Sequence, residues 1–142
     1  MGAVPHRIPL RLTACMSALV AAACASLAPA PSSDLAGTRW AVRSINGQPT
    51  QIRTPSVEFA VEDRIAGGGG CNRYSGVYEA ADGAIAVRAL GRTEMACDTP
   101  VMRQEDAFFT VLDDADRYRR DGEQLVITAE DGGSLVLAPL TL

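Results

Sequence analysis

The segment Gly67–Gly76, GGGGCNRYSG, holds the residue types in this chain that most invite a chemical interpretation. A glycine run can cradle a phosphate, because its backbone amides are free to point at an anion. Phosphate loops, however, lead into a helix whose N-terminal amides meet the anion, whereas Tyr74, Val77 and Tyr78 continue here as a strand pattern. Glycine also permits sharp bends and close approach of two backbones. We therefore expect an architectural role for this segment.

The cysteines of the chain divide into two groups by position. Cys15 lies in the first 23 residues and Cys24 follows directly after them, which leaves Cys71 and Cys97 as the thiols of the fold. In an exported protein such a pair is most often a disulfide, which would stabilise the fold by about 3 kcal/mol. A redox-active pair is the alternative, although redox cysteines usually lie close together in a C-x-x-C unit.

Residues 1–23 have the pattern of a signal peptide. Arg7 and Arg11 occur without any acid, and the next twelve residues are mostly apolar or small. This apolar stretch is shorter than the roughly 20 residues that span a bilayer as a helix. We expect export of the chain to the cell envelope or periplasm.

The apolar stretch ends in VAAAC, which is similar to the bacterial lipobox. We expect Cys24 to be lipidated and to anchor the chain to a membrane, with the inner or outer leaflet left open; cleavage at an Ala-x-Ala site and plain secretion is the alternative. Residues 24–34 are rich in proline, alanine and serine and predict a flexible tether. The folded domain is expected to span residues 35–142.

The composition excludes several classes of site. The only histidine, His6, lies in the predicted signal peptide, and the chain has no lysine, so Ser-His pairs, His-ligated zinc and P-loop lysines are excluded from the mature domain. The formal net charge of −4 becomes −6 without residues 1–23, which argues against nucleic acid. Glu94 and Glu105 do not stand out as a catalytic pair from the general acidity. We expect no enzymatic activity, no cofactor and no metal.

Alternating apolar and polar residues predict strands on both sides of the glycine run. Asn46-Gly47 and Asp82-Gly83 supply tight turns between them. The predicted strands cover residues 38–45, 56–62, 76–80, 84–90, 124–129 and 134–138, and a further strand begins at Ile65 and runs into the glycines.

A single amphipathic helix is expected between the strands, from Asp98-Thr99-Pro100 to about Ala115. Its apolar positions are spaced by three, four and seven residues and should face the core. They are Val101, Phe108, Val111, Leu112 and Ala115. The polar positions Arg103, Gln104, Asp106 and Asp113 should face water. The combination predicts a mainly β (α+β) domain, a small antiparallel barrel-like curved sheet with one helix.

Within the glycine-rich segment, individual residues receive structural interpretations. Asn72 is expected to accept a hydrogen bond within its own turn or to adopt a left-handed conformation beside Gly70. Arg73 is expected to be a solvated charge. Tyr74 belongs to an aromatic set that should form core rather than a ligand cage, together with Trp40, Phe59, Tyr78, Phe108 and Phe109. Gly76 is taken as part of the same structural motif.

Three ordered segments resemble the signature of the META domain family. They are GGGCNRYSGVY at residues 68–78, TEMAC at 93–97 and MRQE at 102–105, preceded by Trp40, Ile45-Asn46-Gly47 and Phe59. The resemblance covers nearly all of residues 35–142. It implies a compact β-barrel-like fold with a helix, an envelope location and a disulfide between the two motif cysteines. The family is linked to envelope stress, antibiotic tolerance and motility, and no catalytic residues are established for it.

The expected function is therefore that of a non-enzymatic envelope protein. It would bind a periplasmic protein or an apolar ligand and contribute to stress tolerance, as a monomer. The alternative is an inhibitor of a basic hydrolase such as lysozyme, because the negative charge of the domain would speed association with a basic enzyme.

Overall fold

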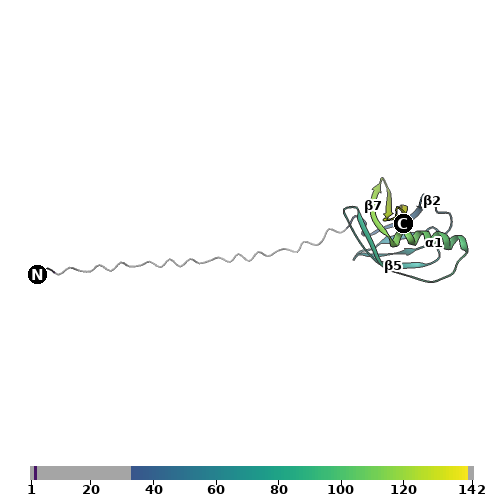
Figure 1. The fold of residues 1–142 in the computed structure, drawn as a ribbon, viewed down its shortest axis with the longest axis horizontal. Coiled ribbons are helices and arrows are strands. Elements are labelled where there is room, and N and C mark those ends of the chain that lie inside the picture. Colours follow the sequence, from purple (N-terminus) through teal and green to yellow (C-terminus); the bar gives the residue numbers. More distant parts are fainter. Residues whose placement is uncertain (1, 3–32, 141–142) are drawn as a thin grey trace.

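The computed structural model describes residues 2 and 33–140, and the fold lies within the second range (Figure 1). The N-terminal half contains β1 (Thr38–Ile45), β2 (Gln48–Pro49), β3 (Ser56–Phe59), β4 (Arg64–Gly68) and β5 (Arg73–Ala81). The C-terminal half contains β6 (Ala84–Arg92), α1 (Thr99–Asp113), β7 (Ala115–Asp121), β8 (Gln124–Ala129) and β9 (Ser134–Pro139). Cys24 and the predicted signal peptide lie outside the described residues.

Eight of the strands close into an antiparallel barrel. Strands β3 to β9 pair in chain order, β1 pairs with β3, and a further pairing of β1 with β9 completes the ring. The short β2 pairs only with the end of β1, at Ser44–Pro49 and Ile45–Gln48. The predicted fold class, a small antiparallel barrel with one helix, is confirmed.

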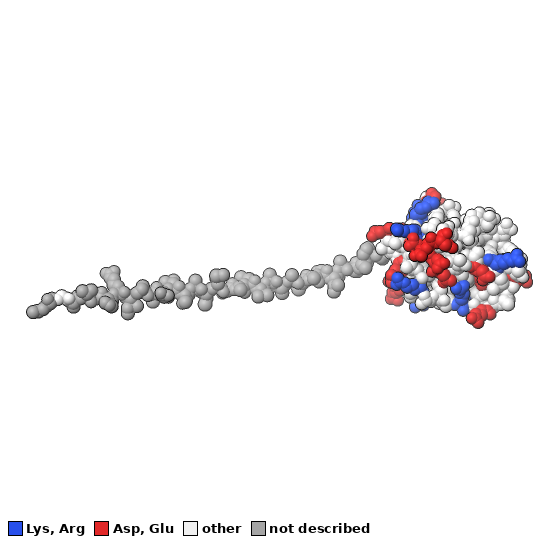
Figure 2. Space-filling model, viewed as in Figure 1, with Lys and Arg blue, Asp and Glu red and all other residues white. Residues whose placement is uncertain are grey.

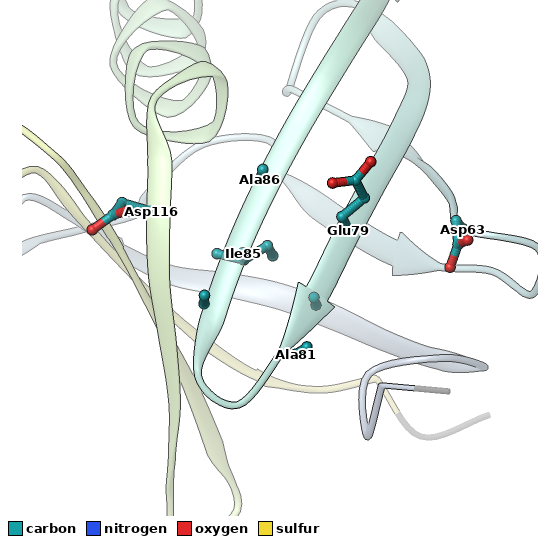
Figure 3. Close-up of a pocket in the computed structure, with 8 residues that line it drawn as sticks. Asp63, Glu79, Ala81, Ile85, Ala86 and Asp116 are labelled. Carbon is teal, nitrogen blue, oxygen red and sulfur yellow. The ribbon is translucent and has the colours of Figure 1, made fainter. Parts of the chain in front are cut away.

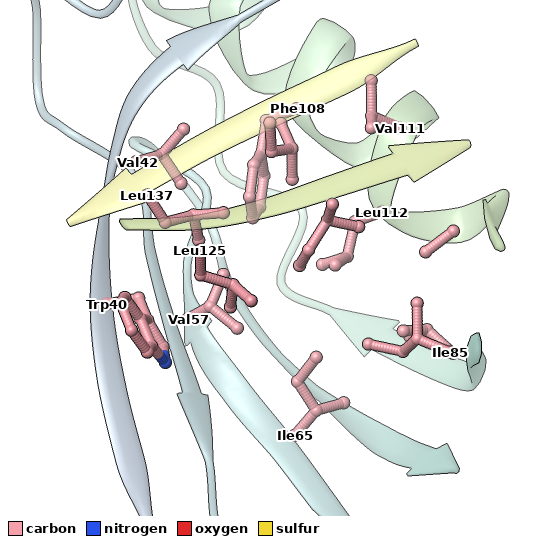
Figure 4. Packing of buried hydrophobic residues seen from close by; sticks show 14 of the residues in the cluster. Trp40, Val42, Val57, Ile65, Ile85, Phe108, Val111, Leu112, Leu125 and Leu137 are labelled. Atoms are coloured by element: carbon pink, nitrogen blue, oxygen red, sulfur yellow. The ribbon is translucent and has the colours of Figure 1, made fainter. Parts of the chain in front are cut away.

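The alternation of the strands determines which side chains fill the barrel. Val57 and Phe59 of β3 and Ile65 of β4 are fully buried, while the residues between them are more accessible. Figure 4 shows Phe108, Val111 and Leu112 of α1 directed toward the same core as Leu125 and Leu137. The interior is therefore filled by side chains from both the strands and the helix.

The helix begins and ends close to the predicted limits. Pro100 occupies the first turn, where its missing amide costs nothing, and the Asp98 carbonyl accepts from the Val101 amide at 2.9 Å. Glu105 lies on the buried face although it was not among the predicted core positions, and Phe109, predicted as core with the other aromatic residues, is buried there as well. Phe109 adds an aromatic ring to the core, and Glu105 adds a carboxylate.

The hydrogen bonds between loops distinguish two ends of the barrel. At one end lie residues 33–34, where Ser33 Oγ is 3.4 Å from Tyr78 Oη and the Tyr118 hydroxyl donates to Asp34 Oδ1 at 2.7 Å. The β5–β6 turn is at the same end, because the Tyr118 amide donates to the Gly83 carbonyl. The opposite end carries the loop of residues 68–72. We call these the tether end and the motif end.

Candidate functional site

A buried carboxylate organises the motif end. Glu105 of α1 is only 2% exposed. Its Oε2 accepts hydrogen bonds from the backbone amides of Cys71 at 2.8 Å and Asn72 at 2.6 Å, and its Oε1 accepts from Asn72 Nδ2 at 2.6 Å. Within residues 33–140, no arginine forms an ion pair with it. Hydrogen bonds to an ionised acceptor are the strong ones, so three donors stabilise the buried group in place of a counter-ion.

Asn72 connects this carboxylate to the segment before the helix. Its Oδ1 accepts from the Met95 amide at 2.6 Å and from Thr93 Oγ1 at 2.8 Å, and its Nδ2 also donates to the Met95 carbonyl at 3.2 Å. The Asn72 carbonyl accepts from the Gly69 amide at 2.7 Å, so Asn72 is an acceptor within its own turn, whereas a left-handed conformation at Asn72 is wrong. The side chain instead bonds to residues more than 20 positions away, because the loop folds back under the helix. The segments GCNRYSG, TEMAC and MRQE therefore meet at one cluster, Asn72, Thr93, Met95 and Glu105, which we call the motif cluster.

A disulfide between Cys71 and Cys97 joins two segments of the same region, as predicted. The two Cα atoms are 6.0 Å apart, and Arg53 Nη1 lies 3.6 Å from Cys97 Sγ. The bond fixes the Cys71 amide close to the position from which it donates to Glu105. Its role here is therefore structural.

Two glycines of the run are required for close packing, and a third for its backbone angle. A Cβ at Gly67 would overlap the Ser56 carbonyl, and a Cβ at Gly69 would lie 2.8 Å from Glu105 Oε2 and 2.7 Å from the Phe109 ring. Gly70 has φ +122°, a conformation that side chains rarely adopt. Gly68 has neither restriction. The architectural interpretation thus applies to three of the four positions.

Alternate residues of the motif have different environments. Tyr74 is buried, donates from its hydroxyl to the Ser56 carbonyl at 2.9 Å, and packs against Phe108 and Phe109. Burial raises the pKa of the Tyr74 hydroxyl well above its ordinary value, so the hydroxyl stays protonated and can donate to the Ser56 carbonyl. Gly76 is also buried, where a Cβ would lie 2.8 Å from the Arg88 carbonyl. Arg73 is exposed.

The described residues offer no arrangement typical of metal or acid–base catalysis. Among residues 33–140, no three His, Cys, Asp or Glu side chains are placed to hold a metal ion. Glu94 is exposed, whereas Glu105 is enclosed by amide donors. In the same part of the chain, no helix is long and apolar enough to span a membrane.

An acidic hollow of about 530 Å³ lies toward the tether end. Figure 3 shows Glu79 on β5, Asp63 on one side of the β5–β6 hairpin and Asp116 of β7 on the other. Alanines and Ile85 form much of the surface between these carboxylates. Over the face seen in Figure 2, acidic and basic side chains are interspersed, without a broad basic patch.

The amino-acid sequence is similar to that of a known bacterial protein. The chain is similar to heat shock protein HslJ of Escherichia coli strain K12, with 27% identity over 93 residues, which is 64% of this chain and 61% of that protein. The match thus covers less than two thirds of the relative's length.

Two solved structures share the fold. An NMR structure of a protein from Burkholderia xenovorans aligns with a TM-score of 0.62 and 24% identity over 76% of this chain and 85% of that one. A crystal structure of a DUF4847 family protein from Bacteroides vulgatus aligns with a TM-score of 0.55 and 16% identity, covering 74% and 94%. The META domain family model matches residues 33–141. The motif cluster, the barrel and this match together show that the chain belongs to the META domain family.

Proposed function

We propose that the chain is an exported, non-enzymatic envelope protein that is anchored through Cys24 and binds a protein partner as part of a stress response. The signal-peptide pattern of residues 1–23 and the VAAAC junction support export and anchoring. Membership of the META domain family supports a stress-related or binding role.

The filled barrel favours a protein partner over an apolar ligand held inside. Small-molecule sites are concave and bury most of their ligand. Here Trp40, Phe59, Tyr78 and Phe108 occupy the interior and are each at most 2% exposed. The buried carboxylate of Glu105 is already hydrogen-bonded to the protein's own amides, which is the arrangement of a structural group rather than a catalytic one.

The observation that carries the proposal is a pair of exposed apolar side chains at the motif end. Met95 is 60% exposed and Ile52 is 41% exposed. Both are held on fixed backbone, because Met95 bonds to Asn72 through its amide and carbonyl, and the Ile52 carbonyl accepts from Gln104 Nε2 at 2.6 Å. Because the backbone that carries these two apolar side chains is already ordered, the backbone loses little conformational entropy on binding, which suits a protein interface.

The experiment is complementation of a deletion strain under antibiotic or heat stress. Met95→Asp combined with Ile52→Asp should abolish protection while the protein remains folded and present at wild-type level. Val61→Asp is the matched control, because Val61 is 68% exposed and lies in the β3–β4 turn at the tether end. Full protection by the double variant, or equal loss with Val61→Asp, would contradict partner binding at the motif end.

Anchoring is tested separately by metabolic labelling with a palmitate analogue. The wild-type chain should be labelled and Cys24→Ala should not. Equal labelling of the two would rule out Cys24 as the lipidated residue.

The acidic hollow favours a second candidate, inhibition of a basic hydrolase such as lysozyme. Asp63, Glu79 and Asp116 would attract a basic enzyme, and their apolar surroundings would accept an inserted side chain. Inhibition of lysozyme by the purified protein, lost in Asp63→Asn combined with Asp116→Asn, would support this candidate. No inhibition at micromolar concentration would exclude it for lysozyme.

A further inference from the structure

The two sulfur atoms of the Cys71–Cys97 disulfide have opposite electrostatic surroundings. Arg53 Nη1 lies 3.6 Å from Cys97 Sγ, whereas Cys71 Sγ lies 3.6 Å from the Met95 carbonyl oxygen. A positive charge is therefore beside one sulfur, and the negative end of a carbonyl dipole is beside the other. Both cysteines are only partly buried, so the bond is not sealed inside the barrel.

The surroundings of Cys97 stabilise negative charge on its sulfur. Within residues 33–140, no carboxylate lies within ion-pair distance of Arg53, so no neighbour neutralises its guanidinium. Cys97 also directly precedes Asp98, the N-cap residue of α1, and the N-terminal end of a helix carries a partial positive charge. The Asp98 and Glu94 carboxylates are exposed, and water weakens their repulsion. Thiolates are stabilised beside arginine and at helix N-termini.

The surroundings of Cys71 oppose negative charge on its sulfur. The Cys71 amide donates to Glu105 Oε2 at 2.8 Å, which places a carboxylate beside this residue. Glu105 is only 2% exposed, and repulsion between like charges is strongest where water is excluded. The Met95 carbonyl oxygen adds a second negative group. The disulfide therefore has one sulfur suited to carry a negative charge and one that is not.

We propose that this disulfide is a thiol-exchange site, at which a low-molecular-weight thiol attacks Cys71 Sγ and Cys97 Sγ leaves. The incoming thiolate donates an electron pair to Cys71 Sγ, the bond between the two cysteines breaks, and its electron pair stays on Cys97 Sγ as a thiolate. The incoming sulfur is oxidised and Cys97 is reduced. The product is a mixed disulfide on Cys71.

The direction of the exchange follows from the charges. The leaving sulfur becomes a thiolate, so the sulfur whose thiolate is better stabilised leaves more readily. Arg53 favours departure of Cys97, and Glu105 disfavours departure of Cys71. The cysteines are 26 positions apart, so this asymmetry comes from residues that only the fold brings to them and not from a C-x-x-C unit.

The motif cluster makes the exchange reversible. Asn72 follows Cys71 directly and bonds to the amide and the carbonyl of Met95, two residues before Cys97. These bonds keep the two cysteines close together after the disulfide opens. The Cys97 thiolate can then attack Cys71 Sγ, expel the attached thiol and restore the original bond.

The test determines which cysteine receives the thiol. The full-length protein with Cys15→Ala and Cys24→Ala retains only Cys71 and Cys97. It is treated briefly with 2-mercaptoethanol, quenched in acid to stop further exchange, digested with pepsin and analysed by mass spectrometry. This reagent carries no fixed charge, so Arg53 does not attract the thiol itself. The adduct on Cys71 should exceed the adduct on Cys97 by at least about threefold.

Arginine variants test the cause of this preference. Arg53→Gln should lower the ratio of the two adducts by about two- to fivefold, as expected for loss of one exposed charge contact, whereas Arg53→Lys should keep most of it. Arg64→Gln is the matched control, because Arg64 is exposed and begins β4 at the end away from residues 68–72. Its ratio should equal that of the parent protein. Circular dichroism checks that each variant is folded.

Three results would overturn the proposal. They are equal adducts or a main adduct on Cys97, a ratio that Arg53→Gln leaves unchanged, and absence of any adduct while the protein remains folded. The exchange takes place in purified protein and needs no partner, so its failure is distinguishable from failure of the proposed function, which complementation reports.

Discussion

Replacing Gly67 by alanine should destabilise the protein far more than the same change at Gly68. Gly67 lies in β4 between Val57 of β3 and Tyr74 of β5. An alanine Cβ would overlap the Ser56 carbonyl and would lie 2.9 Å from the Tyr74 hydroxyl, which donates to that same carbonyl. Because both neighbours are held in the sheet, neither can move away without separating β3 from β4.

The magnitude follows from these contacts. Overpacking of a filled interior costs about 1–3 kcal/mol, and leaving the buried Tyr74–Ser56 bond unmade costs about 1–3 kcal/mol more. A loss of about 3 kcal/mol lowers the Tm of a domain of this size by about 12–24 °C. At Gly68 the nearest atom to a new Cβ is Ser56 Oγ at 3.9 Å, so Gly68→Ala should lie within about 1 kcal/mol of wild type.

The assay is urea and thermal unfolding of both variants, followed by circular dichroism. Equal Tm values for Gly67→Ala and Gly68→Ala would refute the reasoning. They would show that close approach of β3 and β4 does not depend on glycine, and that the run has another purpose.

Two further predictions concern the disulfide and Tyr118. Replacing Cys71 and Cys97 together by serine should lower the free energy of unfolding, measured in urea, by about 3 kcal/mol. If both cysteines of the wild-type protein react with an alkylating agent before reduction, the disulfide is contradicted. Burial and then the hydrogen bond to Asp34 raise the pKa of Tyr118 to about 12, so the tyrosinate absorbance of Asp34→Asn should appear at lower pH than that of wild type. Since the folded pKa exceeds the ordinary value of 10.0, this stabilisation is complete below pH 10 and is lost as pH rises toward about 12; identical titrations would contradict the role of Asp34.

Local patterns in the sequence were sufficient for most strands and turns. The alternation of Val57 and Phe59 follows from the two-residue period of a strand with one buried face, and it does not depend on distant residues. Asn46 and Asp82 adopt positive φ before glycine, as the Asn-Gly and Asp-Gly turns require. The disulfide was predictable because two cysteines remain after the predicted leader and anchor are set aside.

The motif cluster could not be predicted in the same way. Asn72 suits a local turn, and only the folded chain brings Met95 and Glu105 to it. One signal for Glu105 was present, since it lies four residues after Val101 and three before Phe108, on the apolar face of α1. Closure of the barrel by β1 and β9 is likewise a long-range pairing that alternation does not specify.

The central claim is that the signature residues of the motif end stabilise the fold, and the free energy of unfolding of Glu105→Gln tests it most directly. The side-chain NH2 group of the new glutamine would point at Asn72 Nδ2 or at the two backbone N–H groups. All of these are donors, so one donor would lose its acceptor, and the free energy of unfolding is predicted to fall by about 3 kcal/mol. Glu94→Gln, at an exposed position of the TEMAC segment, should stay within about 0.5 kcal/mol of wild type. Wild-type stability of Glu105→Gln would contradict the account and would make this buried carboxylate a candidate for catalysis.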